Sequence, residues 1–142
     1  SMIYCYHRGD RMKKSYKGLV LWLIIYLMGF VPMFGIDDGA VVTRLTLWYT
    51  SVMITALMVI IRNTDSIYWI NGVYFEDAEK AGYEKRMEFA QKHLDKFKKH
   101  TAVYTIFTFA SYFLGWGFWI DIVVFCVSLI ATAFSTINIR LE

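Results

Sequence analysis

The chain has 142 residues, of which 57% are hydrophobic and 19% are charged, and its formal net charge is +3. The hydrophobic residues are gathered into long runs, which excludes an ordinary soluble domain and indicates an integral membrane protein. The small positive charge is explained by where lysine and arginine lie along the chain, so it gives no independent support to nucleic-acid binding.

The N-terminal arm, residues 2–17, is basic. It carries one acid, Asp10, against five cations, Arg8, Arg11, Lys13, Lys14 and Lys17. A secretory signal shares this charge, but the apolar run that follows is too long for one and lacks a small-residue cleavage site. We therefore interpret the arm as a retained cytoplasmic segment.

Residues 18–61 are predicted to form a first transmembrane hairpin. Residues 18–34 carry no charge and nearly suffice to cross about 30 Å of hydrocarbon, and Pro32 falls in the last turn, where it ends the helix. A short turn with Asp37 and Asp38 follows, and residues 40–61 form a second apolar run, interrupted only by Arg44. These two runs predict two crossings.

The polar middle of the chain, residues 62–100, is expected to lie in water. In residues 66–75, Asn71 and Gly72 stand between short aromatic and β-branched runs, a pattern typical of a β-hairpin with a type I′ turn. A hairpin of this kind would lie on the membrane surface. An irregular linker whose aromatic side chains pack against helix ends fits the pattern equally well.

From residue 76 to residue 100 the pattern is that of an amphipathic helix. Acidic residues gather at its start and lysines at its end, the order that the helix dipole favours, while Gly82 is a possible break. Apolar residues at steps of four and three predict a narrow association stripe of Tyr83, Met87, Ala90, Leu94 and Phe97.

Residues 101–140 are predicted to form a second transmembrane hairpin. The third crossing covers about residues 101–119 and the fourth about 121–138, with a tight reversal at Gly115 and Gly117. The expected fold is an all-α integral membrane protein with four transmembrane helices, arranged as two helical hairpins joined by a cytoplasmic amphipathic helix.

The distribution of lysine and arginine predicts the orientation. Fourteen of the fifteen lie in the N-terminal arm, in the central segment with its flanking Arg62, or at Arg140, and only Arg44 lies near the opposite face. By the positive-inside rule both termini and the central segment are cytoplasmic. Short turns and the absence of glycosylation sequons favour a bacterial plasma membrane.

Arg44 is expected near three acidic residues at the outer face. A cation about one turn inside the apolar zone must reach the interface or pair, and Asp37, Asp38 and Asp121 are predicted at the same depth. We interpret this outer charged cluster as a structural ion pair between the two outer turns. The alternative is a charged vestibule for an ion or a small polar ligand.

Small hydroxylated residues recur at helical spacing in the second hairpin. They form an intramembrane polar stripe of Thr105, Thr108, Ser111, Ser128, Thr132 and Ser135. Such residues let transmembrane helices approach closely and form hydrogen bonds, so the stripe favours packing of the bundle over a hydrated pathway.

The sequence carries no catalytic or metal-binding motif. His93 and His100 are seven residues apart with no third ligand at a convincing spacing, so we predict neither a metal site nor a cofactor. Four lysines before the third crossing are candidates for contact with anionic lipid headgroups: Lys92, Lys96, Lys98 and Lys99.

Three functions fit this pattern. The first is an interaction or regulatory membrane subunit, a homodimer or a partner of another membrane protein. The second is a homo-oligomeric channel or transporter for an ion or a small polar solute. The third is a lipid-acting enzyme at the membrane surface that would use His93 and His100. We favour the first, and not an enzyme, because association needs no buried charge or catalytic group.

Overall fold

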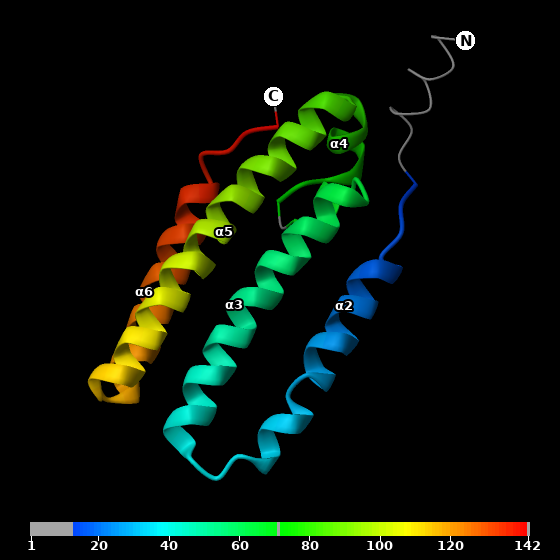
Figure 1. Cartoon of the computed structure of the whole chain (residues 1–142). Helices are drawn as coiled ribbons and strands as arrows, with labels where there is room; N and C mark the ends of the chain where they lie inside the picture. Colours follow the sequence, from blue (N-terminus) through cyan, green and yellow to red (C-terminus); the bar gives the residue numbers. More distant parts are fainter. Residues whose placement is uncertain (1–12, 71, 142) are drawn as a thin grey trace.

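The computed structural model describes residues 13–70 and 72–141. Within them every regular element is helical, in agreement with the expected all-α class. Helices α3, α5 and α6 lie side by side, with α2 on the far side of α3 (Figure 1). The elements in chain order are α2 (Lys17–Met28), η1 (Val31–Gly35), α3 (Gly39–Asn63), η2 (Ile67–Trp69), α4 (Phe75–Ala81), α5 (Tyr83–Leu114) and α6 (Phe118–Thr136).

The first apolar run forms a short α-helix followed by a 3-10 turn. Helix α2 ends at Met28, earlier than the sequence suggests, and η1 begins at Val31. Pro32 explains this change because it has no N–H to donate to the carbonyl of Met28 and its ring crowds that carbonyl. The Tyr49 hydroxyl lies 3.0 Å from the carbonyl oxygen of Tyr26 and supplies a donor at this helix end.

Helix α3 is the central helix, since it packs against α2, α5 and α6. Its start is fixed by Asp38, whose carboxylate accepts hydrogen bonds from the backbone N–H groups of Ala40 at 3.0 Å and Val41 at 3.3 Å. Capping of this kind satisfies donors that have no partner within the helix.

Helix α5 is continuous from the polar middle into the apolar C-terminal part of the chain. It has 32 residues, so the predicted amphipathic helix and the predicted third crossing are one element. The break predicted at Gly82 is present, because this residue separates α4 from α5 with a φ of 89°, a conformation that glycine adopts without a Cβ penalty.

The predicted β-hairpin is wrong for the residues that the structure describes, which contain no strand. Ile67–Trp69 is a 3-10 helix, and the side chains of Ile67 and Tyr68 are buried; Asn71 lies outside the described residues. Ile67 packs with Ile61, Ala78, Phe89 and Ala90, so tertiary packing overrides the local turn preference. The alternative of an irregular linker packed against helix ends describes this segment better.

Helices α5 and α6 are joined by the tight reversal expected at the glycines. Gly115 has a φ of 71°, and the N–H of Trp116 donates to the carbonyl of Ser111 at 3.0 Å. This left-handed termination at a glycine closes helix α5. Helix α6 then begins at Phe118, a few residues before the predicted start.

Among the residues that the structure describes, three helical segments are long and apolar enough to cross a membrane: Lys17–Gly35, Gly39–Asn63 and Phe118–Thr136. Helix α5 is not among them, since the first half of this helix is charged. The start of α2 and the end of α6 lie at the same end of the molecule as α4 (Figure 1).

Candidate functional site: a polar seam inside the helix bundle

Polar side chains form a buried line along one face of α5, which we call the polar seam. Its members recur at helical spacing, so they share the face that packs against α3 and α6. They are Arg86, His93, His100, Tyr104, Thr108 and Ser111.

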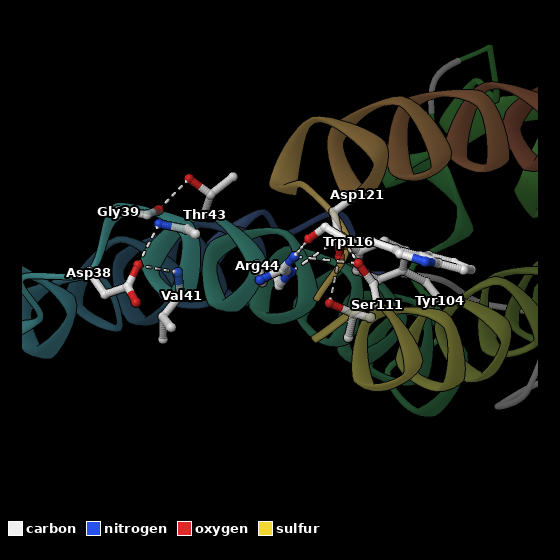
Figure 2. Close-up of polar contacts among 11 residues, drawn as sticks. Asp38, Gly39, Val41, Thr43, Arg44, Tyr104, Ser111, Trp116 and Asp121 are labelled. Carbon is white, nitrogen blue, oxygen red and sulfur yellow. Dashed lines mark hydrogen bonds and ion pairs between the residues drawn. The ribbon is translucent and has the colours of Figure 1, made fainter. Parts of the chain in front are cut away.

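The first cluster on the seam joins the starts of α3 and α6. Arg44 Nε lies 3.3 Å from Asp121 Oδ1, and Asp121 is fully buried while the Arg44 side chain is 12% exposed. Figure 2 shows Arg44 pointing toward Asp121, Ser111 and Trp116, whose carbonyl oxygen also accepts from the guanidinium. The ion pair therefore links two helices that are distant in sequence.

Three hydroxyl groups of α5 complete the coordination of the Asp121 carboxylate. Thr108 donates to Oδ2 at 2.8 Å, Ser111 to Oδ1 at 2.5 Å, and the Tyr104 hydroxyl lies 3.5 Å from Oδ2. A buried carboxylate is tolerated when its oxygens accept hydrogen bonds and a cation balances its charge. We call Arg44, Asp121 and these three residues the Asp121 cluster.

The other two residues predicted for an outer charged cluster do not join it. Asp38 caps α3 through Ala40 and Val41, away from Arg44 (Figure 2), and Asp37 is exposed in the turn before this helix. Of the three aspartates considered from the sequence, the structure brings Asp121 to Arg44.

A neutral bridge lies farther along the seam. His100 contacts Ser51 of α3 through Nε2 at 3.3 Å and Ser128 of α6 through Nδ1 at 3.0 Å, so one imidazole connects three helices. Ser51 and His100 are both buried. Hydroxyl contacts extend this seam between α3 and α5, for example between Thr55 and Thr101 at 2.7 Å.

The second charged cluster was not predicted from the sequence. Arg86 is fully buried and binds Asp65 through two hydrogen bonds of 2.8 and 3.0 Å, and it also donates to the carbonyl of Ala78 at 3.2 Å. This Arg86 cluster ties α5 to α4 and to the loop after α3. The available signal was its spacing, since position 86 lies four residues before Ala90 on the predicted stripe.

His93 lies between the neutral bridge and the Arg86 cluster. It is buried, and its Nδ1 lies 3.0 Å from the carbonyl oxygen of Phe89. Burial lowers the pKa of His93, because the charged form loses its hydration, while the hydrogen bond to Phe89 opposes this shift. His93 and His100 face different partners. Within the described ranges no three His, Cys, Asp or Glu residues are grouped to hold a metal ion.

The predicted association stripe is largely covered by the chain itself. Ala90, Leu94 and Phe97 are buried, Met87 is half-buried, and only Tyr83 is exposed. The residues that suggested contact with a partner thus pack between α5 and other helices of the same chain.

The predicted intramembrane polar stripe divides among several roles. Thr108 and Ser111 bind Asp121, Ser128 contacts His100, and Thr105 accepts a hydrogen bond from the indole of Trp48 at 3.0 Å. Thr132 and Ser135 donate to carbonyls of their own helix. Both residues also line a groove between α5 and α6.

The four predicted lipid-contacting lysines separate into two groups. Lys92, Lys96 and Lys99 line the groove between α5 and α6, which has a volume of about 640 Å³, whereas Lys98 is exposed outside it. Lys92 also forms an ion pair of 2.9 Å with Glu88 one turn earlier, as expected for acid before base on a helix.

The chain matches no protein-family model, no curated protein and no solved structure. The chemistry of the site therefore rests on its geometry. In the described parts of the chain every buried side-chain nitrogen and oxygen has a hydrogen-bond partner. Such mutual satisfaction is typical of a polar network that holds helices in one arrangement.

Proposed function

We propose that this protein is a four-pass membrane subunit that acts by association, with itself or with another membrane protein. The observation that carries the proposal is the mutual satisfaction of the buried polar groups on the seam. Because these groups hold α3, α5 and α6 together, we expect the function to depend on contacts made by the outer surfaces of the bundle.

The path of the chain supports a fourth crossing by α5. Arg44 near the start of α3 contacts Asp121 near the start of α6, so both helices begin at the same end. After α3 ends, the chain has to return to that end before α6 begins, and α5 makes this passage. Residues 101–114 would span about 21 Å, and the lysines before them can extend to the headgroups.

Helix α2 is the part of the bundle best placed for association. It packs against α3 and has no buried residue. Trp22 and Tyr26 face α3, where the Trp22 indole donates to the carbonyl of Met53 at 2.9 Å and the Tyr26 hydroxyl lies 2.9 Å from that of Thr50. Ile24 projects from the opposite side of the helix and is 49% exposed.

The test is cross-linking of single cysteines in native membranes. Ile24→Cys should yield a disulfide-linked dimer or a heteromeric product, in a background with Cys5 and Cys126 changed to serine. Leu94→Cys is the matched control and should stay unlinked, because this position is buried within the bundle. A chain that remains monomeric in liposomes at every lipid dilution, with no partner captured, would contradict the proposal.

Transport is a second candidate because Asp121 is a buried carboxylate within the helix bundle. Ionisable groups inside membranes often mark ion or proton pathways. The carboxylate has Tyr104 and Thr108 as neighbours, and His100 follows one turn from Tyr104 along the seam. Flux through liposomes that is abolished by Asp121→Asn, and not by neutralising Asp37 and Asp38 in the exposed turn, would favour this function over association.

A further inference from the structure

The groove between α5 and α6 is lined by both cationic and neutral polar side chains. Lys92, Lys96 and Lys99 line it from α5, and Ser128 lines it from α6. Its volume of about 640 Å³ lies within the range of small-ligand sites. The groove is therefore large enough for part of an amphiphile, and it is charged at one edge.

The charge of the groove favours an anion. Asp95 also lines it and keeps its negative charge while it accepts a hydrogen bond of 2.7 Å from Gln91, and Lys92 is balanced by Glu88; the two remaining lysines of the lining outweigh this single acid. In the described part of the chain Lys96 and Lys99 form no ion pair with an acid. Two cationic groups are thus available to an anionic ligand.

The apolar surface next to the groove continues toward the uncharged half of α5. Val103 lines the groove and is 55% exposed, and Ile106, one turn farther, is 72% exposed. On the facing helix the wall contains the small side chain of Ala131, which leaves room for an alkyl chain. Charged and apolar parts therefore follow one another in the order found in a phospholipid.

We infer that this groove binds an anionic phospholipid, with its phosphate at Lys96 and Lys99 and an acyl chain passing Val103. The inference rests on the proposed crossing by residues 101–114, which places the lysines at the membrane surface, but not on association.

The test measures binding of a phosphatidylglycerol to the purified full chain in neutral detergent micelles, by native mass spectrometry. The double variant Lys96→Gln/Lys99→Gln should weaken binding roughly 30-fold, because each lysine near an anionic surface contributes a factor of about five. The matched control is Lys85→Gln/Lys98→Gln, which removes two exposed lysines of the same helix from outside this groove and should leave binding within about twofold.

A second variant tests the apolar part of the groove without changing its charge. Ala131→Phe should fill the wall and lower phosphatidylglycerol binding at least tenfold, while the circular dichroism spectrum stays that of the parent. Two further ligands serve as controls. Phosphatidylcholine lacks the net negative charge, and inorganic phosphate lacks the acyl chains.

The outcomes separate the possible ligands. Equal losses in the two lysine variants would overturn the inference in favour of diffuse surface attraction, and equal binding of inorganic phosphate would overturn it in favour of a free anion. An Ala131→Phe variant that binds lipid normally, or that changes only the oligomeric state, would overturn it as well. A monomeric chain that binds phosphatidylglycerol would contradict the proposed association and leave the lipid site standing.

Discussion

The two charged clusters on the polar seam are built in opposite ways. In the Asp121 cluster the carboxylate is fully buried and the Arg44 side chain is 12% exposed, whereas in the Arg86 cluster the guanidinium is fully buried and the Asp65 side chain is 24% exposed. Each cluster supplies extra partners to its buried member, hydroxyl groups for Asp121 and a backbone carbonyl for Arg86. The partly exposed member of each pair keeps access to its surroundings.

This contrast predicts which half of each ion pair matters more for stability. Removing one partner of a buried pair costs most when the charge left behind cannot regain water. The partly exposed residue should therefore be the more costly one to neutralise, since its loss leaves the buried partner uncompensated.

The largest expected effect is at Asp65. Asp65→Asn should lower the free energy of unfolding by about 3 kcal/mol or more, because the Arg86 guanidinium stays buried without its counter-charge. Asparagine tolerates the φ of 54° found at this position, so the backbone is preserved.

The comparison variant for Asp65→Asn is Arg86→Met, which should cost about 1–2 kcal/mol because the remaining carboxylate can be hydrated. Both free energies of unfolding are to be measured by titrating the protein in mild detergent with sodium dodecyl sulfate and following the loss of helix by circular dichroism. A larger loss of unfolding free energy for Arg86→Met than for Asp65→Asn would contradict the expectation that the partly exposed partner is the more costly one to neutralise.

At the Asp121 cluster the acid is the buried member, so we expect removal of the base, Arg44, to lower the free energy of unfolding more than removal of the acid. Arg44→Met should cost about 2–3 kcal/mol, less than Asp65→Asn, since Asp121 keeps its hydroxyl donors when the cation is lost. Asp121→Asn should cost about 1 kcal/mol, because the Arg44 side chain is partly exposed and keeps the carbonyl of Trp116 as a partner. Equal losses of unfolding free energy in the two variants would mean that burial does not set the order.

The neutral bridge between the clusters should show a smaller effect. Ser51→Ala leaves Nε2 of the buried His100 without its partner on α3, at an expected cost of about 1–2 kcal/mol in the same unfolding measurement. Ser135→Ala is the control and should change stability by less than about 0.5 kcal/mol, since that hydroxyl only donates to its own helix. A Ser51→Ala cost as large as that of Asp65→Asn would remove the distinction between neutral and charged parts of the seam.

The smallest expected effect is a pH dependence from His93. Because burial lowers the pKa of His93 in the folded protein, its contribution to stability is complete above about pH 6.5, the pKa of a hydrated histidine. That contribution is lost as the pH falls from there through the lower pKa of the folded state. His93→Phe should therefore narrow the difference in unfolding free energy between pH 7.5 and pH 5.5, and an unchanged difference would assign the pH dependence to another group.

Some features of the fold were predictable from local sequence signals. The helical class, the tight reversal at Gly115 and the break at Gly82 follow from uncharged runs and from glycine, because these signals act over a few residues. An acidic partner for Arg44 was also expected, since a cation in an apolar run must reach the interface or pair, but the sequence did not distinguish Asp121 from Asp37 and Asp38. The Arg86 cluster was not predicted, because Arg86 on a charged helix resembles an ordinary solvated side chain.

By itself the sequence determined that the long apolar runs are helical and that the chain breaks or reverses at Gly82 and Gly115, since hydrophobic runs and glycine act locally. Only the tertiary structure decided that α5 runs unbroken past His100, that Ile67–Trp69 packs into the core instead of forming a strand, and that Ala90, Leu94 and Phe97 are covered by the chain's own helices. The physical reason is that one helical face serves equally well for a neighbouring helix of the same chain and for a partner. The choice between them depends on contacts between residues far apart in the sequence.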